Sequence, residues 1–476
     1  MSPISDNWPD VAASLEILEP EYANRVISTV EQLKPHHRQV EEYATSFHPQ
    51  KLPCKLLSDH YTWGQSFLVY ELLFNDNTSW IIRFGMPPMD AYFNTAAQLE
   101  RKISNEVAAL RLVRQRTTIP VPEILSYHAH PSPANPLGPQ FPAFVLMTAI
   151  RGMTIDECGI SIEELGSGYS TALPDPFGDD EKKRGILQQY LRDIADIHVQ
   201  LSKITFNQIG SFKIDSDGDV SVGPGADFGL GPFNSAREYF AIQAEAYERL
   251  AVAAGLEDEY EEENEKPNDA QLKRRFVASL WKKAMMPLVD ERDDRGPFPM
   301  RHGDLHSDNI LVDETGHIVG VLDWDCAGTV PWEAFAVPTY EVSGHFTDSD
   351  ASSFYSCSSS ESTSSSISSS PSVTRSIVHN AFNQELAAAE SQDGVVLVKP
   401  ASGRSLAALH DSDAGHVGAY LAYWMYSLAC DYDHTGRALH RMLGSDDNMD
   451  QDFLKFTKEV DAISALEGQF EGFDLN

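Results

Sequence analysis

The first third of the chain carries short, continuous apolar runs that are typical of β-strands. Residues 67–74 and 80–84 are rich in Phe, Val, Ile and Leu, and the Asn-Asp-Asn sequence between them favours a turn. The two runs therefore predict a β-hairpin. Residues 141–148 predict a further strand. We expect these strands to belong to one twisted antiparallel sheet.

Apolar residues recur at helical spacing in the segments that separate and follow these strands. A helix is predicted for residues 98–116 because five apolar residues share one of its faces: Leu99, Ile103, Val107, Leu110 and Val113. Residues 185–201 show the same periodicity, and further helices are expected at 236–254 and 271–288. One sheet near the start and mostly helices afterwards predict an α+β fold.

The composition argues against several classes of binding partner. The 476 residues include 36 Lys and Arg against 71 Asp and Glu, and the net charge of −35 repels nucleic acid and anionic membranes. Five widely spaced cysteines without a C-x-x-C pair indicate a reducing compartment. The beginning has no apolar signal segment, and the apolar residues 418–430 are too short to span a bilayer. We expect a cytoplasmic protein with no nucleic acid and no membrane partner.

The densest group of chemically active residues is the sequence HGDLHSDNILV at 302–312. Residues 310–312 and 318–322 are apolar runs with turn residues between them, so they predict a second β-hairpin. Asp304 and Asn309 lie on the loop that enters this hairpin, and Asp323 follows its second strand. The hairpin should therefore bring three oxygen-bearing side chains to one end.

Phosphoryl transfer requires such a set of side chains. One carboxylate accepts the proton of the attacking hydroxyl, while a carboxylate and a carboxamide hold Mg²⁺, which prefers oxygen ligands. Asp304 and Asn309 keep the D-x-x-x-x-N spacing of kinase catalytic loops, and Asp323 lies at the place of the D-F-G aspartate. The alternative is an acidic turn that happens to precede a hairpin.

These motifs resemble those of the aminoglycoside phosphotransferase and choline kinase group, in particular fungal proteins with an aminoglycoside-phosphotransferase domain. The resemblance implies a bilobal protein-kinase-like fold that uses ATP and Mg²⁺. It assigns Asp304 as the catalytic base and Asn309 and Asp323 as metal ligands.

The same resemblance implies nucleotide contacts from the first strands. The loop with Gly64 and Ser66 would cover the phosphates, and Arg83 would occupy the place of the phosphate-binding lysine. Glu106 would be the partner of Arg83, with Glu100 as a competing choice. Backbone groups from Met147 to Ile150 would bind the adenine. The alternatives are an ordinary hairpin turn for the Gly64 loop and surface charges for Arg83 and Glu106.

Two departures from protein kinases favour a small acceptor. Gly303 replaces the arginine that reads an activation-loop phosphate, and Pro331 follows Asp323 by only eight positions, 331 − 323. We therefore expect a small molecule with a hydroxyl group as the acceptor. The remaining alternatives are a pseudokinase that binds ATP without turnover and a Ser/Thr protein kinase.

The expected organisation has three parts. Residues 1–50 form a helical extension outside the first lobe, where three apolar residues share one face: Val26, Val30 and Leu33. Residues 51–148 form the small nucleotide-binding lobe, with an antiparallel sheet plus a helix, and residues 149–476 form the large, mainly helical catalytic lobe. The serine-dominated residues 349–376 are expected to be a disordered insertion, as a tolerated linker or a phosphorylated loop.

Four aspartates of the last part have two interpretations. They line an acceptor pocket for a cationic substrate or they are solvated helix ends: Asp411, Asp413, Asp431 and Asp433.

Overall fold

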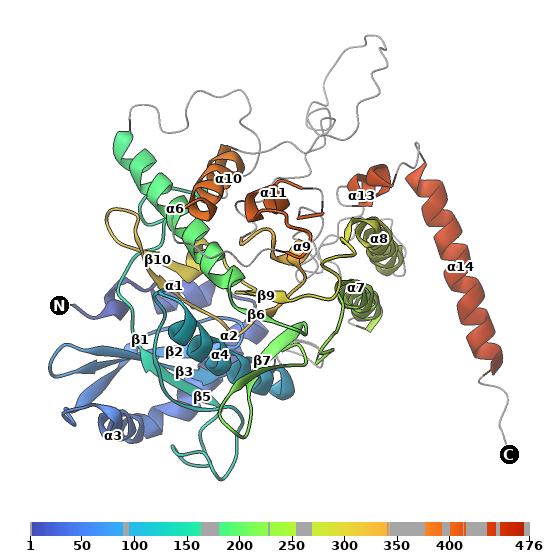
Figure 1. Cartoon of the computed structure of the whole chain (residues 1–476). Helices are drawn as coiled ribbons and strands as arrows, with labels where there is room; N and C mark the ends of the chain where they lie inside the picture. Colours follow the sequence, from blue (N-terminus) through green and yellow to red (C-terminus); the bar gives the residue numbers. More distant parts are fainter. Residues whose placement is uncertain are drawn as a thin grey trace, which may run out of the picture. The chain divides into compact units, whose positions relative to one another are not determined.

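The computed structural model describes the chain in segments: residues 2–88, 95–162, 180–226, 229–253, 269–339, 342, 377–392, 400–412, 414–415, 436–443 and 448–470. Figure 1 shows the helices and strands coloured along the sequence. The chain divides into two compact units. Unit 1 comprises Met1–Ser161, Phe177–Pro232 and Phe298–Val330, and unit 2 comprises Ile162–Pro176, Phe233–Pro297 and Pro331–Asn476. Unit 1 thus contains both the first strands and the HGDLHSDNILV sequence.

The main sheet of unit 1 has five strands in the order β1-β2-β3-β5-β4. Their bounds are β1 Cys54–Trp63, β2 Phe67–Phe74, β3 Ser79–Gly85, β4 Ile124–His128 and β5 Phe144–Thr148. All neighbouring strands are antiparallel. The predicted β2–β3 hairpin forms, and Asn77 in its turn has a φ of 67°, a left-handed conformation that asparagine tolerates.

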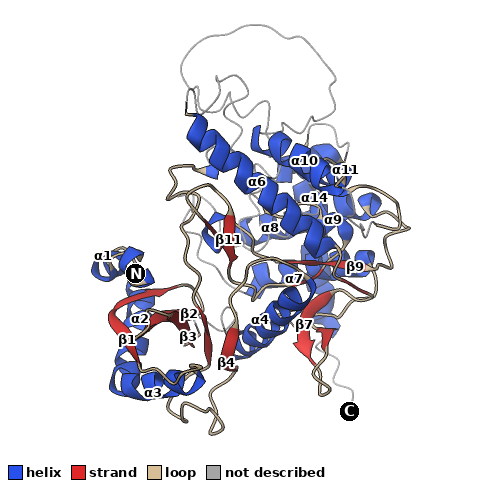
Figure 2. Ribbon diagram, turned by 60° about the vertical axis from the view of Figure 1, so that its left-hand side comes forward, coloured by secondary structure: helices blue, strands red, loops and turns tan. Residues whose placement is uncertain are grey.

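Helices cover both faces of this sheet because its strand residues alternate in direction (Figure 2). Leu68, Tyr70 and Phe84 pack with residues of the N-terminal helices α2 (Pro20–Leu33) and α3 (His37–Phe47). On the opposite face, Phe67 and Val145 pack with the helix α4 (Ala96–Arg116). The short elements η1 (Ile4–Asn7), α1 (Val11–Glu16) and η2 (Lys34–His36) complete the N-terminal part.

The helix α4 matches the predicted 98–116 segment and starts at a capping box. The Thr95 side chain accepts from the backbone of Gln98, whose side chain accepts from the Thr95 backbone. The same helix lies beside β4 and also beside β7 (Gly210–Ile214), a strand of a second sheet (Figure 2). It therefore connects the two sheets of unit 1.

The second sheet has the order β6-β9-β12-β7-β8 and was not expected from the sequence. Its other strands are β6 (Thr205–Phe206), β8 (Val220–Gly223), β9 (Phe298–Arg301) and β12 (Gly328–Thr329). The predicted catalytic hairpin is present as β10 (Ile310–Val312) and β11 (Ile318–Val321). The helix η4 (Ser307–Asn309) precedes it, and α6 (Glu181–Ser202) matches the predicted 185–201 helix.

Unit 2 is helical in the residues that the structure describes. The expected helices 236–254 and 271–288 form α7 (Ala236–Ala253) and α8 (Asp269–Met285) followed by η3 (Met286–Leu288). The other helices are α9 (Trp332–Phe335), α10 (Ile377–Glu390), α11 (Leu406–His410), α13 (Arg437–Met442) and α14 (Met449–Phe470). The α+β class, with an antiparallel sheet near the beginning and mostly helices later, is confirmed.

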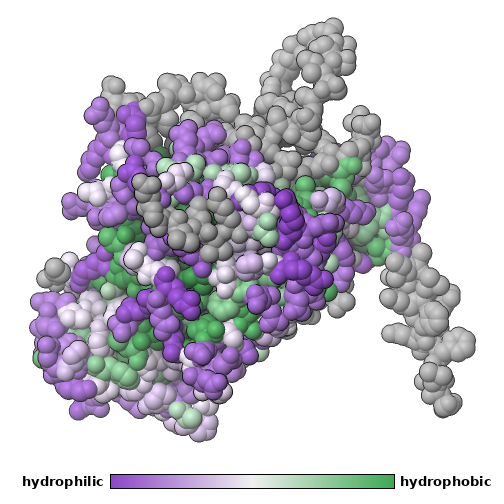
Figure 3. Space-filling model, viewed as in Figure 1, coloured by the Kyte–Doolittle hydropathy of each residue, from purple (hydrophilic) through white to green (hydrophobic). Residues whose placement is uncertain are grey.

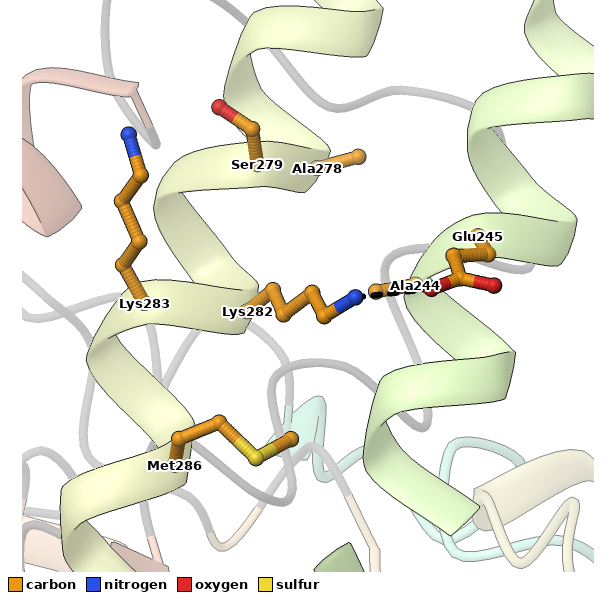
Figure 4. Close-up of a pocket in the computed structure, with 7 residues that line it drawn as sticks. All are labelled: Ala244, Glu245, Ala278, Ser279, Lys282, Lys283 and Met286. Carbon is orange, nitrogen blue, oxygen red and sulfur yellow. Dashed lines mark hydrogen bonds and ion pairs between the residues drawn. The ribbon is translucent and has the colours of Figure 1, made fainter. Parts of the chain in front are cut away.

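A cavity of about 540 Å³ lies on unit 2 between α7 and α8 (Figure 4). Its lining is mostly apolar, with an ion pair of 2.8 Å between Lys282 Nζ and Glu245 Oε1 at its side. None of the predicted catalytic residues lines it.

Several expectations fall on residues outside the described part of the chain. These are the serine-dominated residues 349–376, the apolar stretch 418–430, and the aspartates 413, 431 and 433. Asp411 is described, and it lies directly after α11 with its Oδ1 3.4 Å from His379 Nε2.

Hydrophilic residues cover much of the face that Figure 3 shows. Among the described helices, none combines the length and the apolar character needed to cross a membrane.

Candidate active site

His302 links the loop before β10 to Leu322, the residue that follows β11. Its ring is 1% exposed, Nε2 donates to Leu322 O at 2.8 Å, and Nδ1 accepts from Asp304 N at 3.3 Å. Burial lowers the pKa of His302 to about 4, so the ring is neutral at physiological pH. A neutral imidazole has one donor and one acceptor nitrogen, which these two hydrogen bonds require.

Gly303 is required by a close backbone contact. Its φ is +94°, and a Cβ at this position would lie 2.1 Å from Cys326 O. Only glycine fits without moving the 323–327 segment, so the absence of the usual kinase arginine has a steric cause.

Asp304 follows in the same loop with a half-exposed carboxylate. Its Oδ2 lies 3.7 Å from His306 Nε2. Burial alone would raise the pKa of Asp304, but the hydrogen bond and charge of His306, with smaller contributions from His302 and Lys102, hold that pKa below its usual value. The carboxylate is therefore ionised at neutral pH and able to accept a proton.

Asn309 is oriented by its amide nitrogen. Nδ2 donates to Asp304 O at 2.9 Å and lies 3.0 Å from His306 Nε2. The nitrogen is thus directed at the loop, and the side-chain oxygen is the acceptor of the amide. The backbone carbonyl of Asn309 accepts from Leu322 N at 2.8 Å, which ties the loop to the strand before Asp323.

Asp323 is held in a left-handed conformation with a φ of 59°. Aspartate tolerates this region better than most side chains do. Its carboxylate is 40% exposed, and Oδ1 lies 3.3 Å from Arg83 Nη1. The next residue, Trp324, packs its ring against His302 with 4.4 Å between the ring centroids.

The structure brings Arg83 and Glu106 together in a buried ion pair. Arg83 Nη2 contacts Glu106 Oε2, and the guanidinium lies over the Phe67 ring, 4.5 Å from its centroid. Burial raises the pKa of Glu106 to about 7, against the opposing effect of Arg83, and the charge of Asp323 adds to the increase. Glu100, the competing choice, lies near His130 instead, with Oε1 and Nδ1 3.5 Å apart.

The two residues of the predicted phosphate loop have different environments. Gly64 lies in open space on its Cβ side, and its carbonyl accepts from the hydroxyl of Tyr22 at 2.8 Å. Ser66 is 8% exposed, and its carbonyl accepts from Met86 N.

The predicted adenine-binding stretch follows β5. The backbone N–H groups of Thr148 and Ala149 already donate to Glu123 O and Ser79 O. Met147 is buried on the face of the sheet that α4 covers. The Ile150 side chain packs against Gly320 of β11, where an added Cβ would lie 2.8 Å from Ile150 Cγ2. This stretch therefore lies between the main sheet and the catalytic hairpin.

The donor set suits Mg²⁺ if phosphate oxygens complete it. The described residues contain no cluster of three His, Cys, Asp or Glu side chains arranged to hold a metal. Magnesium is usually bound by one or two protein carboxylates together with substrate phosphates. One carboxylate from Asp323 and one amide oxygen from Asn309 fit this mode of binding.

The sequence interpretation assigned no role to three residues that surround these groups. His302 and His306 orient Asp304 and Asn309, and Asn105 binds the backbone after Asp323. The histidines were visible as the two flanks of Gly-Asp-Leu in the motif. Asn105 precedes Glu106 in the helix, but its partners after Asp323 are more than 200 positions away in the sequence.

The model of the phosphotransferase enzyme family matches residues 61–333, more than half of the chain. The chain belongs to this family, which confirms the resemblance. No curated protein matches the chain.

Several solved structures are similar to the chain. One is a thermostable mutant of an aminoglycoside phosphotransferase in a ternary complex with AMP-PNP and hygromycin B. It is 14% identical and covers 82% of this chain and 92% of its own, with a TM-score of 0.40. The macrolide 2′-phosphotransferase of Brachybacterium faecium is 14% identical, covering 87% and 99% with a TM-score of 0.39. The Plasmodium vivax ethanolamine kinase is 14% identical, covering 93% and 99% with a TM-score of 0.38.

Proposed function

We propose that the protein transfers the terminal phosphoryl group of ATP to a hydroxyl group of a small molecule, with Mg²⁺ as the metal. The observation that carries this proposal is the connection between Asp304 and Asn309. One amide nitrogen holds the backbone of the expected base, and the same amide offers its oxygen to the expected metal. Membership of the phosphotransferase family supports the reaction class.

The side chains divide the work of the reaction. Asp304 accepts the proton of the acceptor hydroxyl while the hydroxyl oxygen attacks the terminal phosphorus, and the bond to the bridging oxygen of ADP breaks. Asn309 and Asp323 would hold Mg²⁺, which when bound neutralises charge on the phosphate oxygens. Arg83 orients the phosphates and is itself held by Glu106. Gly64 and Ser66 cover the phosphates, and residues Met147 to Ile150 receive the base.

The segment after Asp323 favours a small acceptor over a protein. The strand β12 pairs with β9 and β7 from Gly328 onward, and α9 begins at Trp332. Only four residues, 324–327, lie between Asp323 and this strand. A peptide-docking activation segment has no place in this described part of the chain.

A cytoplasmic location is also part of the proposal. Neither Cys54 nor Cys158 forms a disulfide, as expected in a reducing compartment.

The decisive experiment measures ADP formation from ATP and, in parallel, GDP formation from GTP, with a panel of amino alcohols, sugars and aminoglycosides. Phosphorus NMR of the product identifies the phosphorylated oxygen, and the Asp304→Asn variant is the control for contaminating activity. Turnover with one acceptor supports the proposal. Tight binding of Mg-ATP without turnover of any acceptor indicates a pseudokinase, and phosphorylation of serine in a protein substrate would replace the small acceptor.

A further inference from the structure

Asn105 of α4 makes three side-chain hydrogen bonds to backbone groups that are distant in the sequence. Its side chain is 1% exposed, and Nδ2 donates to Asp325 O at 2.8 Å and to Ala327 O at 2.7 Å. Oδ1 accepts from Phe212 N of β7 at 2.6 Å. The two donors and the acceptor of the amide thus join α4, the second sheet and the segment that follows Asp323.

Lys102 adds a second connection from the preceding turn of the helix. Its Nζ lies 3.6 Å from Asp325 Oδ2, and both side chains are only 9% exposed. Residues three positions apart lie on the same face of a helix, so Lys102 and Asn105 approach the same segment. The buried Asp325 carboxylate thereby has a cation beside it, as a buried charge requires.

The helix α4 holds the 323–327 segment at both of its ends. At the start, Glu106 contacts Arg83, which contacts the carboxylate of Asp323. At the end, Asn105 binds the carbonyls of Asp325 and Ala327. Asp323 has a left-handed backbone conformation, and such a conformation persists only where neighbouring contacts maintain it.

We infer that Asn105 is a positioning residue that fixes the backbone after Asp323 and so directs the Asp323 carboxylate toward Mg²⁺, with the Lys102–Asp325 pair as a second support. This inference rests on the proposed function, because it takes Asp323 as a metal ligand. Asn105 acts through the backbone of the segment that carries the ligand, and not through contact with the nucleotide or the metal.

A role in packing alone would have a different effect from a positioning role. Loss of a buried amide leaves carbonyls without donors and lowers stability wherever the amide lies. Loss of a support for a metal ligand additionally weakens metal binding, typically by about 10-fold to 100-fold. The dependence of nucleotide binding on Mg²⁺ concentration separates the two roles.

Asn135 provides a matched control within unit 1. It is 4% exposed, Nδ2 donates to Phe141 O and Pro142 O, and Oδ1 accepts from Leu137 N. The pattern is the same as at Asn105, with two carbonyls and one N–H group. All of its partners lie within seven positions and none belongs to the HGDLHSDNILV loop or to residues 323–327.

The experiment titrates Mg²⁺ against binding of a fluorescent ATP analogue in the full-length wild type, Asn105→Ala and Asn135→Ala. We expect the half-saturating Mg²⁺ concentration to rise about tenfold in Asn105→Ala and to stay at the wild-type value in Asn135→Ala. Both variants should lose thermal stability. An unchanged Mg²⁺ requirement in Asn105→Ala, or an equal shift in both variants, overturns the inference.

Lys102→Met keeps the test decisive if Asn105→Ala does not fold. This change removes the charge and retains most of the alkyl stem, and it should raise the Mg²⁺ requirement in the same direction by a few fold; an unchanged requirement overturns the inference. The readout needs no acceptor, so the two proposals fail separately. Absence of Mg²⁺-dependent binding in the wild type refutes the proposed function and this inference, whereas normal wild-type binding with unaffected variants refutes this inference alone.

Discussion

The two aspartates of the Asp323-Trp324-Asp325 sequence have opposite environments. The Asp323 carboxylate is 40% exposed and has Arg83 beside it, so it can exchange this contact for a metal. The Asp325 side chain is 9% exposed and faces Lys102, so its charge is already compensated inside the protein. Asp323 is therefore suited to binding an ion, whereas Asp325 is suited to holding the backbone of the 323–327 segment.

Replacing the expected base tests the chemistry most directly. Asp304→Asn keeps the size of the side chain but cannot accept the proton, so kcat should fall by about a hundredfold or more. Binding of Mg-ATP should change little, because Asp304 is not among the expected ligands. Steady-state kinetics and nucleotide titration measure the two effects. Turnover at the wild-type rate would remove Asp304 from the mechanism.

The pKa of Glu106 predicts a pH dependence of nucleotide binding. Because the pKa in the folded protein is raised to about 7, the charged form that pairs with Arg83 exists above this pH and is lost below it. The affinity of wild type for Mg-ATP should exceed that of Glu106→Gln by about tenfold at pH 8, from the loss of one charged hydrogen bond. This advantage should disappear below about pH 6.

The comparison of variants at each pH cancels the titration of ATP itself. Glu100→Gln is the control, since Glu100 lies on the same helix but is half-exposed and near His130. Its affinity should follow the wild type at every pH. A constant difference between wild type and Glu106→Gln from pH 5 to 8 contradicts the predicted role of the charge.

At the level of residues, short spacing was enough to place Asp304, Asn309 and Asp323 on one loop and one hairpin, and their roles stay predictions. Asp304, Asn309 and Asp323 lie close together because one loop and one hairpin carry them. The supports of these groups were not predictable. Asn105 and Tyr22 reach partners at separations of 220 and 42 positions, and a single sequence contains no signal for such contacts.

Among the elements, α2 connects the N-terminal extension to the predicted phosphate loop. The hydroxyl of Tyr22 donates to Gly64 O at 2.8 Å, and Nε of Arg25 donates to Pro87 O. Tyr22 and Arg25 are three positions apart and so share a face of the helix. Through these two contacts, α2 holds the β1–β2 loop and the segment after β3. It does so from the face of the sheet opposite to α4.

Removal of the Tyr22 hydroxyl should therefore loosen the Gly64 loop. One neutral hydrogen bond contributes about 1 kcal/mol, so we expect Tyr22→Phe to raise the KM for ATP by up to about fivefold at nearly constant kcat. The matched control is Tyr43→Phe, which removes a hydroxyl of α3 that lies 2.7 Å from Ser126 Oγ. Equal KM values in all three proteins would show that α2 does not position the loop.

The predicted and unpredicted elements differ in length and in the distance of their partners. Strands β2 and β3 are long and adjacent in the sequence, so their apolar runs and the turn between them were sufficient. The second sheet contains β6 and β12, with two residues each, and brings residue 205 beside residue 299. Strands this short have no periodicity, and only tertiary pairing creates them.

At the scale of the molecule, residues 349–376 offer a test of tolerance to deletion. This serine-dominated segment follows the catalytic hairpin and lies outside the described part of the chain. Its composition supplies little apolar area, and ordering costs about 1–2 kcal/mol per residue. A short Gly-Ser linker in its place should preserve the melting temperature within a few degrees and the rate of ATP turnover. Lost turnover at constant stability would instead indicate a regulatory segment.

Unit 2 contains a buried charge group that bears on the stability of the whole chain. Nη2 of Arg404 lies 3.1 Å from Asp293 Oδ2 and 3.2 Å from Glu333 Oε1, and both acidic side chains are fully buried. Burial raises the pKa of Glu333, and Arg404 opposes this rise. One guanidinium thus compensates two carboxylates from separate parts of the chain.

We predict that Arg404→Met destabilises the protein by about 3 kcal/mol or more, because it leaves two carboxylates buried without a cation. The loss should be larger at pH 8 than at pH 5. A carboxyl group whose folded-state pKa is raised stabilises the fold while it is protonated and loses this contribution as the pH rises through that pKa. Arg292→Met is the control, since Arg292 is 62% exposed in its pair with Asp290 and solvent screens that pair, so its loss should destabilise the protein much less. Thermal unfolding of both variants at the two pH values measures the loss of stability. Equal losses in the two variants would contradict the prediction, and so would a smaller loss for Arg404→Met at pH 8 than at pH 5.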